Sequence, residues 1–169
     1  MKQLFVLLMM SMLTLTSITA QRIAVVDVNG ILESNDAYIN AQKEIDQVSA
    51  QWRQEIAQEY DKIKSMYNKY QAEQVLLSDE VRASRENEIM EKEKEVRDLQ
   101  KQRFGPEGDL FVKRTELVSP IQDRVFAAIE SFASERGYDL IFDKSSAAGL
   151  IFANEEFDKT EDVKRKVAN

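Results

Sequence analysis

The residues that could carry acid–base or metal chemistry are few in this chain. Its 169 residues include no His and no Cys, so the commonest general base and the thiolate nucleophile are both absent. Asp27, Asp139 and Asp143 lie at or near the ends of short apolar segments, where they could in principle gather around a metal ion. Acidic residues at such places more often cap turns and helices, which is the role we expect for them.

Two motifs for nucleophilic and nucleotide chemistry are absent as well. Ser145 and Ser146 directly follow Lys144, and this order lacks the S-x-x-K spacing of Ser-Lys acyl enzymes. The chain also has no G-x-x-x-x-G-K-S/T phosphate-binding loop. The sequence therefore predicts a protein that is not an enzyme and that uses neither a metal ion nor another cofactor.

The first twenty residues have the pattern of a secretory signal peptide. Lys2 precedes an apolar stretch from Leu4 to Leu15, and a region of small residues ends at Ala20. The apolar stretch is short for a membrane span, and no Cys is available to accept a lipid. We therefore expect residues 1–20 to be removed and the mature protein to be soluble and exported.

The charge balance limits the partners. The formal net charge is -7 at pH 7, and cleavage after Ala20 would change it to -8 because Lys2 is the only charged residue removed. Nucleic acids and anionic lipids are bound mainly by clustered Lys and Arg. The densest basic run, from Lys92 to Arg103, is interleaved with acids and predicts a solvated helix face. No nucleic acid is an expected partner.

The middle of the chain has helical periodicity between two short apolar segments, Ile23 to Val28 and Tyr138 to Asp143. Its apolar residues recur at spacings of three and four and form two stripes, of which the second is thinner. The first stripe contains Ile45, Val48, Trp52, Ile56, Tyr60, Ile63, Tyr67 and Tyr70, and the second contains Val81, Ile89, Val96 and Leu99.

A turn is expected between the stripes, at Leu76 to Glu80, with Ser78 as the N-cap of the second helix. Two antiparallel helices would then form an arm from residues 38–112, with its tip near residues 74–79. At about 1.5 Å per residue, such an arm is about 60 Å long. An arm of this shape exposes far more surface than it buries.

Most stripe residues should pack against the partner helix. The thin second stripe cannot cover every apolar group of the first, and uncovered apolar patches are interaction surfaces. The residues that we predict to bind a partner lie toward the tip and are Ile63, Met66, Tyr67, Tyr70, Leu76 and Leu77.

The returning part of the arm is interrupted by a segment that disfavours a helix. Gly105, Pro106 and Gly108 fall within five residues, and Pro lacks the amide donor while Gly loses more entropy than other residues on ordering. We predict a kink or hinge there, close to the root of the arm, with Phe104 opposite about Val48. Whether the segment moves is left open.

Helical periodicity resumes after this break and ends before Gly137, a glycine that suits a helix C-cap. Within this run, Ser119 and Pro120 have two interpretations. They could restart a helix as N-cap and first helical residue, or they could lie inside one kinked continuous helix.

The remaining residues, 21–37 and 113–169, should form a small α+β body. Its core is too small for independent stability without disulfides, so we expect neighbouring chains to complete it. The expected elements are strands from Ile23 to Val28, Tyr138 to Asp143 and Leu150 to Ala153, a turn at Asn29-Gly30, and a final helix capped by Thr160.

These segments together resemble a known family. RIAVVDVNGILESNDAY leads into AQKEID, a long charged hairpin follows, and ELVSPIQDRVFAAIESFASERGYDLIFDKSSAAGLIFAN precedes a final TEDVKRKV. This order is similar to that of the Skp/OmpH family of periplasmic outer-membrane-protein chaperones, and the similarity covers essentially the whole mature chain. In that family three chains interlock their strands, and three helical hairpins surround a cavity that takes in unfolded outer-membrane proteins.

The resemblance implies a homotrimer whose small β-sheet body carries antiparallel coiled-coil hairpins inserted between strands. It further implies an ATP-independent holdase in the periplasm that binds unfolded outer-membrane β-barrel proteins in a cavity between the arms. The best-known members are basic, whereas this chain is acidic, so lipopolysaccharide or anionic lipid binding is not carried over. A structural coiled-coil spacer or adaptor of the cell envelope is the alternative, and it predicts one defined partner.

Overall fold

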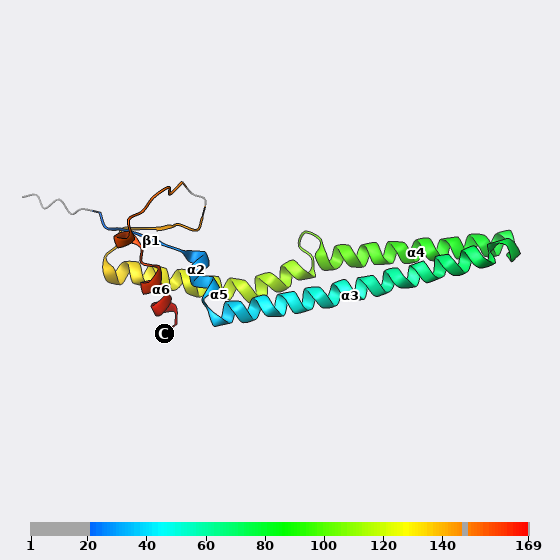
Figure 1. The fold of residues 1–169 in the computed structure, drawn as a ribbon, viewed down its shortest axis with the longest axis horizontal. Helices are drawn as coiled ribbons and strands as arrows, with labels where there is room; N and C mark the ends of the chain where they lie inside the picture. The colour runs from blue at the N-terminus through cyan, green and yellow to red at the C-terminus, as the bar shows by residue number, and fades with distance from the viewer. Residues whose placement is uncertain (1–20, 147–148, 169) are drawn as a thin grey trace, which may run out of the picture.

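The protein, analysed as a computed structural model, is elongated, with a small body at one end and two long helices extending from it (Figure 1). The structure describes residues 21–146 and 149–168, so the expected signal peptide lies outside the described residues. The elements in chain order are β1 (Ile23–Val26), α2 (Val28–Glu33), α3 (Asp36–Glu73), the 3-10 helix η1 (Gln74–Leu76), α4 (Asp79–Phe104), α5 (Asp109–Arg136), β2 (Leu140–Asp143), the 3-10 helix η2 (Glu155–Phe157) and α6 (Thr160–Val167).

β1 is shorter than the sequence predicted, because Asp27 is the N-cap of a helix that begins at Val28. The Asp27 side chain accepts a hydrogen bond from the backbone amide of Gly30 at 2.8 Å and acts as the N-cap of α2. The turn predicted at Asn29-Gly30 is therefore wrong, since both residues lie inside α2. A Cβ at position 30 would lie 3.1 Å from the Asp27 carboxyl carbon, so glycine leaves room for the cap.

The sheet contains two parallel strands that are separated in sequence by the whole arm. Ile23 of β1 pairs with Leu140 of β2, which brings together the two segments of the body that flank the arm in the sequence. The third strand predicted at Leu150 to Ala153 is wrong, because these residues form no strand in the described structure. Instead, Asp158 pairs with the edge of β1 through a single parallel bridge to Val25.

The core of the body lies where α2, α5 and α6 meet β1. Its most completely buried side chains are Val26, Ile31, Val125 and Val163. α5 is continuous through Pro120, so the interpretation with one helix is confirmed. As predicted, that helix ends at Gly137, whose left-handed φ of 66° favours glycine.

The final helix begins where expected, but Thr160 is its first helical residue rather than its N-cap. The amide and hydroxyl of Thr160 both donate to the Asp158 carboxylate, at 2.9 and 2.6 Å. The same hydroxyl accepts a hydrogen bond from the Asp27 amide at 2.9 Å. Asp158 therefore accepts the hydrogen bonds that the first residue of α6 donates. The Thr160 hydroxyl links that helix to Asp27, the residue that follows β1.

No helix within the described ranges is both long enough and apolar enough to cross a lipid bilayer.

Candidate functional site

The arm consists of α3 and α4, which run antiparallel along most of their lengths (Figure 1). Four buried apolar side chains form its central seam: Ile56 and Ile63 from α3, and Ile89 and Val96 from α4. Each pair is seven residues apart, the spacing that keeps coiled-coil residues on one face. The 38 residues of α3 correspond to a length of about 57 Å. So long a hairpin with so few buried apolar side chains leaves most of its surface in solvent.

Tyrosines of the first stripe reach across the seam through their hydroxyl groups. Tyr67 donates to Glu93 at 3.1 Å, and Tyr70 donates to Glu86. The hydrogen bond to Glu93, together with its negative charge, raises the pKa of Tyr67. The hydrogen bond to Glu86 likewise raises the pKa of Tyr70. These bonds fix the rings at the surface of the hairpin.

The tip exposes apolar side chains that nothing in the described chain covers. Val75 is 80% exposed and Leu76 is 85% exposed, while the adjacent Leu77 is half-buried. α4 begins directly after Ser78, as predicted, although the Ser78 side chain makes no capping hydrogen bond. The Arg82 side chain instead donates to the carbonyl oxygen of Leu77 at 3.1 Å and holds the turn.

The six residues predicted to bind a partner occupy different environments. Ile63 is buried in the seam, and Met66 and Tyr70 pack against it. Tyr67 and Leu76 are exposed. Sequence reasoning passed over further exposed side chains of the arm, among them Val75 and Met90. The position of Val75 directly before Leu76-Leu77 was a usable signal.

The chain between α4 and α5 forms a tight loop that protrudes beside the arm (Figure 1). A Cβ at Gly105 would lie 2.4 Å from the carbonyl oxygen of Lys101, and one at Gly108 would lie 2.6 Å from that of Gln102. Side chains at these two positions would therefore clash with the backbone of α4. The helix break predicted at this segment is present, with Pro106 inside the loop.

Arg103 joins three elements at the root of the arm. Its guanidinium lies 4.8 Å from the ring centroid of Trp52 on α3, and its Nη1 donates to Asp109 at the start of α5 at 2.7 Å. Its Nη2 lies 3.7 Å from Glu55, and its buried Nε has no hydrogen-bond partner in the described structure. Phe104 packs edge-on against Trp52 with ring centroids 6.2 Å apart, one helical turn from the expected position opposite Val48.

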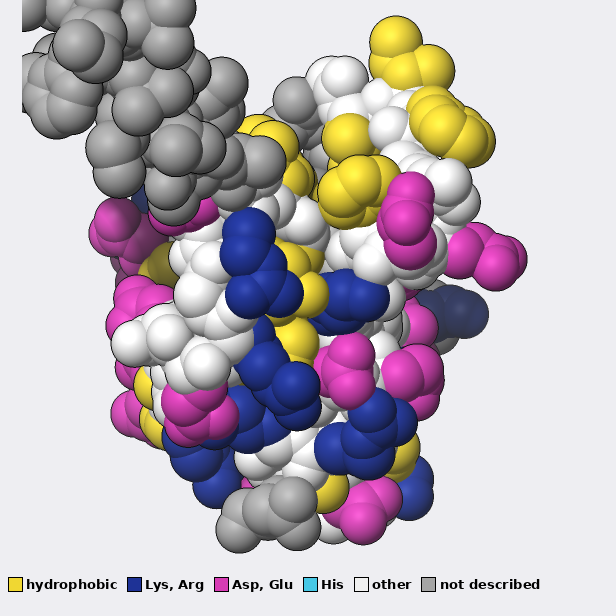
Figure 2. Space-filling model, turned by 90° about the vertical axis from the view of Figure 1, so that its left-hand side faces the viewer, with side chains coloured by type: hydrophobic (Ala, Val, Ile, Leu, Met, Phe, Trp, Pro, Cys, Tyr) yellow, Lys and Arg dark blue, Asp and Glu magenta, His cyan; other side chains and the backbone are white. Residues whose placement is uncertain are grey.

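The body also has an apolar surface. Ile151 and Phe152 are 99% and 82% exposed in the segment after β2. Figure 2 shows hydrophobic side chains gathered at the top of this end of the molecule, with acidic and basic groups mixed over the rest of the face. The other exposed apolar side chains of the body's strands and loops are Ile23, Leu140, Phe142, Leu150 and Phe157. An apolar surface of this kind is typical of an interface.

The three aspartates considered as metal ligands form separate hydrogen bonds. Asp139 accepts from the Arg22 amide at 2.8 Å. Asp143 accepts from the amides of Val28 and Ser145, at 3.2 and 2.9 Å. Burial raises the pKa of Asp143, but hydrogen bonds, first among them that from the Ser145 hydroxyl, outweigh burial and lower it. The described residues contain no group of three or more potential ligands that could hold a metal ion.

Comparisons with known proteins agree with this architecture. A family model described as outer membrane protein (OmpH-like) matches residues 22–167. The fold is similar to the crystal structure of a candidate outer membrane chaperone (OmpH-like) from Caulobacter crescentus CB15, with a TM-score of 0.73 and 10% sequence identity over 88% of this chain and 85% of that chain. No curated protein matches the sequence.

Proposed function

Because this chain belongs to the OmpH-like family of outer membrane proteins, we propose that it is an ATP-independent holdase chaperone of the periplasm. Its clients would be unfolded outer-membrane β-barrel proteins, which it would keep from aggregating before membrane insertion. The observation that carries this proposal is the long arm, whose tip exposes Val75 and Leu76 to solvent. No catalytic step is part of the proposed function.

The physical properties of the client explain why such an arm is suitable. An unfolded β-barrel chain in water has unpaired strand edges and apolar side chains that alternate with polar ones. Burying one Val or Leu side chain contributes about 1.5–3 kcal/mol, so a single tip binds weakly. Several arms acting on one client would combine weak contacts into a useful affinity, while each contact could still break quickly.

We further propose that three chains form the working unit. The two-stranded sheet is small, and Ile151 and Phe152 expose apolar surface that neighbouring chains would cover. Three arms would then surround one cavity and bend at Gly105, Pro106 and Gly108. Sedimentation equilibrium should give three times the mass of the mature chain, and a stable folded monomer would contradict the trimer.

Capture is proposed to depend on apolar contact rather than on charge, because the chain is acidic and its basic residues lie among acids. Lys92, for example, lies 2.5 Å from Glu95 on the same helix. Lipopolysaccharide and anionic lipid are therefore not proposed as ligands. Client affinity should change little across a salt series, and a steep loss at moderate salt would indicate an electrostatic mechanism.

The decisive experiment is aggregation of an unfolded outer-membrane barrel protein, followed by light scattering as denaturant is diluted. The mature protein at several-fold molar excess should suppress the signal, and an equal concentration of an unrelated acidic helical protein should not. Unchanged aggregation in the presence of the mature protein would refute the holdase proposal.

One observation favours the alternative of a coiled-coil spacer or adaptor. Arg103 links α3, α4 and α5 at the root, which would suit an arm held at a fixed angle. An adaptor should bind one defined partner with a fixed stoichiometry and should leave the aggregation of several unrelated barrels unchanged. The light-scattering experiment, repeated with different clients, distinguishes the two functions.

A further inference from the structure

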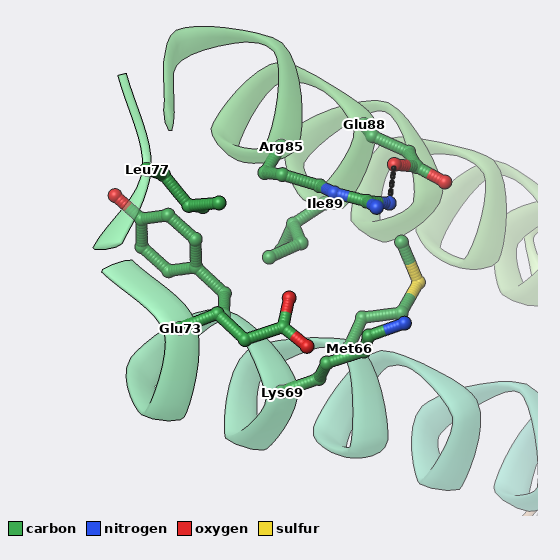
Figure 3. A pocket seen from close by; sticks show the side chains of 8 residues that line it. Met66, Lys69, Glu73, Leu77, Arg85, Glu88 and Ile89 are labelled. Atoms are coloured by element: carbon green, nitrogen blue, oxygen red, sulfur yellow. Dashed lines mark hydrogen bonds and ion pairs between the residues drawn. The ribbon is translucent and has the colours of Figure 1, made fainter. Parts of the chain in front are cut away.

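A cavity of about 160 Å³ lies near the end of the arm, between α3, α4 and the connection that joins them. Its apolar wall is formed by Met66 and Tyr70 of α3, Leu77 of the connection and Ile89 of α4. Figure 3 shows Met66, Leu77 and Ile89 reaching toward the same space from these three segments. The cavity is thus a feature of the folded hairpin rather than of either helix alone.

The sequence of α4 explains why this space is left unfilled. Val96 and Ile89 follow one another at heptad spacing along the seam, and the next position toward the tip is Arg82. The Arg82 side chain turns to the carbonyl oxygen of Leu77 and does not supply an apolar layer. The seam therefore ends at Ile89, while α3 continues to present Met66 and Tyr70.

The rim of the cavity carries equal numbers of opposite charges. Arg85 and Glu88 form an ion pair at 3.1 Å on one side, as the dashed line in Figure 3 marks. Lys69 and Glu73 line the other side, on α3. A rim with two cations and two anions has no net charge to attract a charged ligand. It suits a neutral occupant whose apolar part enters the cavity.

The volume and the wall together indicate which neutral group fits. An enclosed apolar cavity of about 150 Å³ holds a benzene molecule, so an open cavity of about 160 Å³ has room for one aromatic ring. A thioether such as that of Met66 makes favourable contacts with aromatic rings, and the Tyr70 ring can pair with another ring at its edge or face. We propose that this cavity binds one neutral aromatic side chain of an unfolded protein chain.

This inference rests on the proposed function for the identity of the client. Transmembrane β-barrels carry girdles of aromatic residues at both membrane interfaces, so every client of this kind offers many such rings. A single ring in an open cavity binds weakly, with a dissociation constant of about a millimolar. Each arm would then hold a client by one ring at a time, in addition to contacts with the exposed tip.

The experiment uses the mature protein with ¹³C-labelled methyl groups of Met, Leu, Ile and Val, titrated with N-acetyl-phenylalaninamide. Methyl signals of Met66, Leu77 and Ile89 should shift saturably, while those of Val75 and Leu76 should not. N-acetyl-leucinamide and a phenylalanine derivative with a free carboxylate should each bind at least about fivefold more weakly. No saturable shift, or equal shifts at Leu76 and Leu77, would overturn the inference.

Two adjacent leucines offer a matched pair of variants. Leu77→Ala removes part of the wall and should weaken binding of the phenylalanine probe at least about fivefold. Leu76→Ala removes a side chain that lies outside the wall and should leave probe binding unchanged. Equal effects of the two variants would contradict the inference, and the wild-type titration decides the question even if Leu77→Ala fails to fold.

Probe binding and client protection are measured separately, so the two proposals can fail independently. If wild-type protein suppresses aggregation but does not bind the probe, the aromatic cavity is refuted and the holdase function is retained. If the probe binds at Leu77 but aggregation is unchanged, the cavity is supported and the holdase function is refuted.

Discussion

Replacing Arg103 with Met should loosen the root of the arm, because this side chain contacts three different elements. Met keeps much of the length of the side chain but removes the charge and all hydrogen bonds. The charge-assisted hydrogen bond to Asp109 at 2.7 Å contributes about 1.5–3 kcal/mol, and the cation–π contact with Trp52 about 0.5–1 kcal/mol. The 3.7 Å pair with Glu55 adds less than about 1 kcal/mol.

The stabilisation by these three contacts is partly offset by the Arg103 Nε atom, which the same substitution removes. The Arg103 Nε is buried without a partner, which costs about 1–3 kcal/mol. The expected net loss for Arg103→Met is therefore about 1–2 kcal/mol of unfolding free energy. The loss should be concentrated where α3, α4 and α5 meet.

The sequence provides a direct probe, because Trp52 is the only tryptophan in the chain. In Arg103→Met the fluorescence of Trp52 should shift to the red as the ring becomes more hydrated. The midpoint of urea unfolding, followed by this fluorescence, should move to a lower urea concentration. Hydrogen exchange of the amides in residues 105–112 should become faster.

Arg97→Met is a suitable control for this substitution. The Arg97 side chain is 61% exposed, and it forms an ion pair with Glu93 on the same helix at 3.6 Å. Its replacement should change the unfolding free energy by less than about 0.5 kcal/mol and should leave the Trp52 spectrum unchanged. If the two variants have the same spectra and urea midpoints, the role assigned to Arg103 is wrong.

Three further predictions concern an acid, a loop and a tyrosine. Burial raises the pKa of Asp158, but hydrogen bonds from Lys144 and Thr160 and the Lys144 charge outweigh burial and lower it from 3.8 to about 2. Its ionised form thus stabilises the fold fully above about pH 4, and this contribution is lost as the pH falls through about 2. In chemical denaturation Asp158→Asn should therefore cost about 1 kcal/mol at pH 7, and the cost should shrink below about pH 4 and vanish only below about pH 2. Gly108→Ala should destabilise by at least about 1 kcal/mol, because its Cβ would lie 2.6 Å from a carbonyl oxygen of α4; an unchanged thermal midpoint would contradict this. Tyr67 should ionise at a pH above its ordinary pKa of 10.0, because the Glu93 carboxylate accepts the hydrogen bond of its hydroxyl group. A spectrophotometric titration of the wild-type protein, compared with that of Tyr67→Phe, measures this pKa.

The arm could be predicted from local pattern, because helical spacing and helix-breaking residues act over a few positions. Ile56 and Ile63 recur at seam spacing, and Gly105 and Pro106 interrupt the return, as the structure confirms. Details that depend on the partner helix could not be predicted. The stripe did not show that Arg82 would turn to a backbone carbonyl and leave a cavity at the end of the seam.

The body was harder to predict, because its short segments are determined by distant contacts. Asp27 follows a run with strand character, yet its side chain caps a helix that packs on α5 and α6. Leu150 to Ala153 has strand composition, but the edge of β1 that it would need is bridged by Asp158. Thr160 looks like a cap from sequence alone, and only the fold brings Asp27 within reach of its hydroxyl.

The parallel pairing of β1 with β2 also constrains the order of folding. Residues such as Arg22 and Asp139 are 117 positions apart, so closing the chain between them without intermediate structure costs about 4 kcal/mol of entropy. A hairpin that forms first, from local contacts, carries its two ends back to nearly the same place and removes most of that loop. The length of the arm is then no obstacle to assembling the body, provided that the seam is already closed. Substitutions in the seam should accordingly slow the appearance of the sheet, even though they lie far from it.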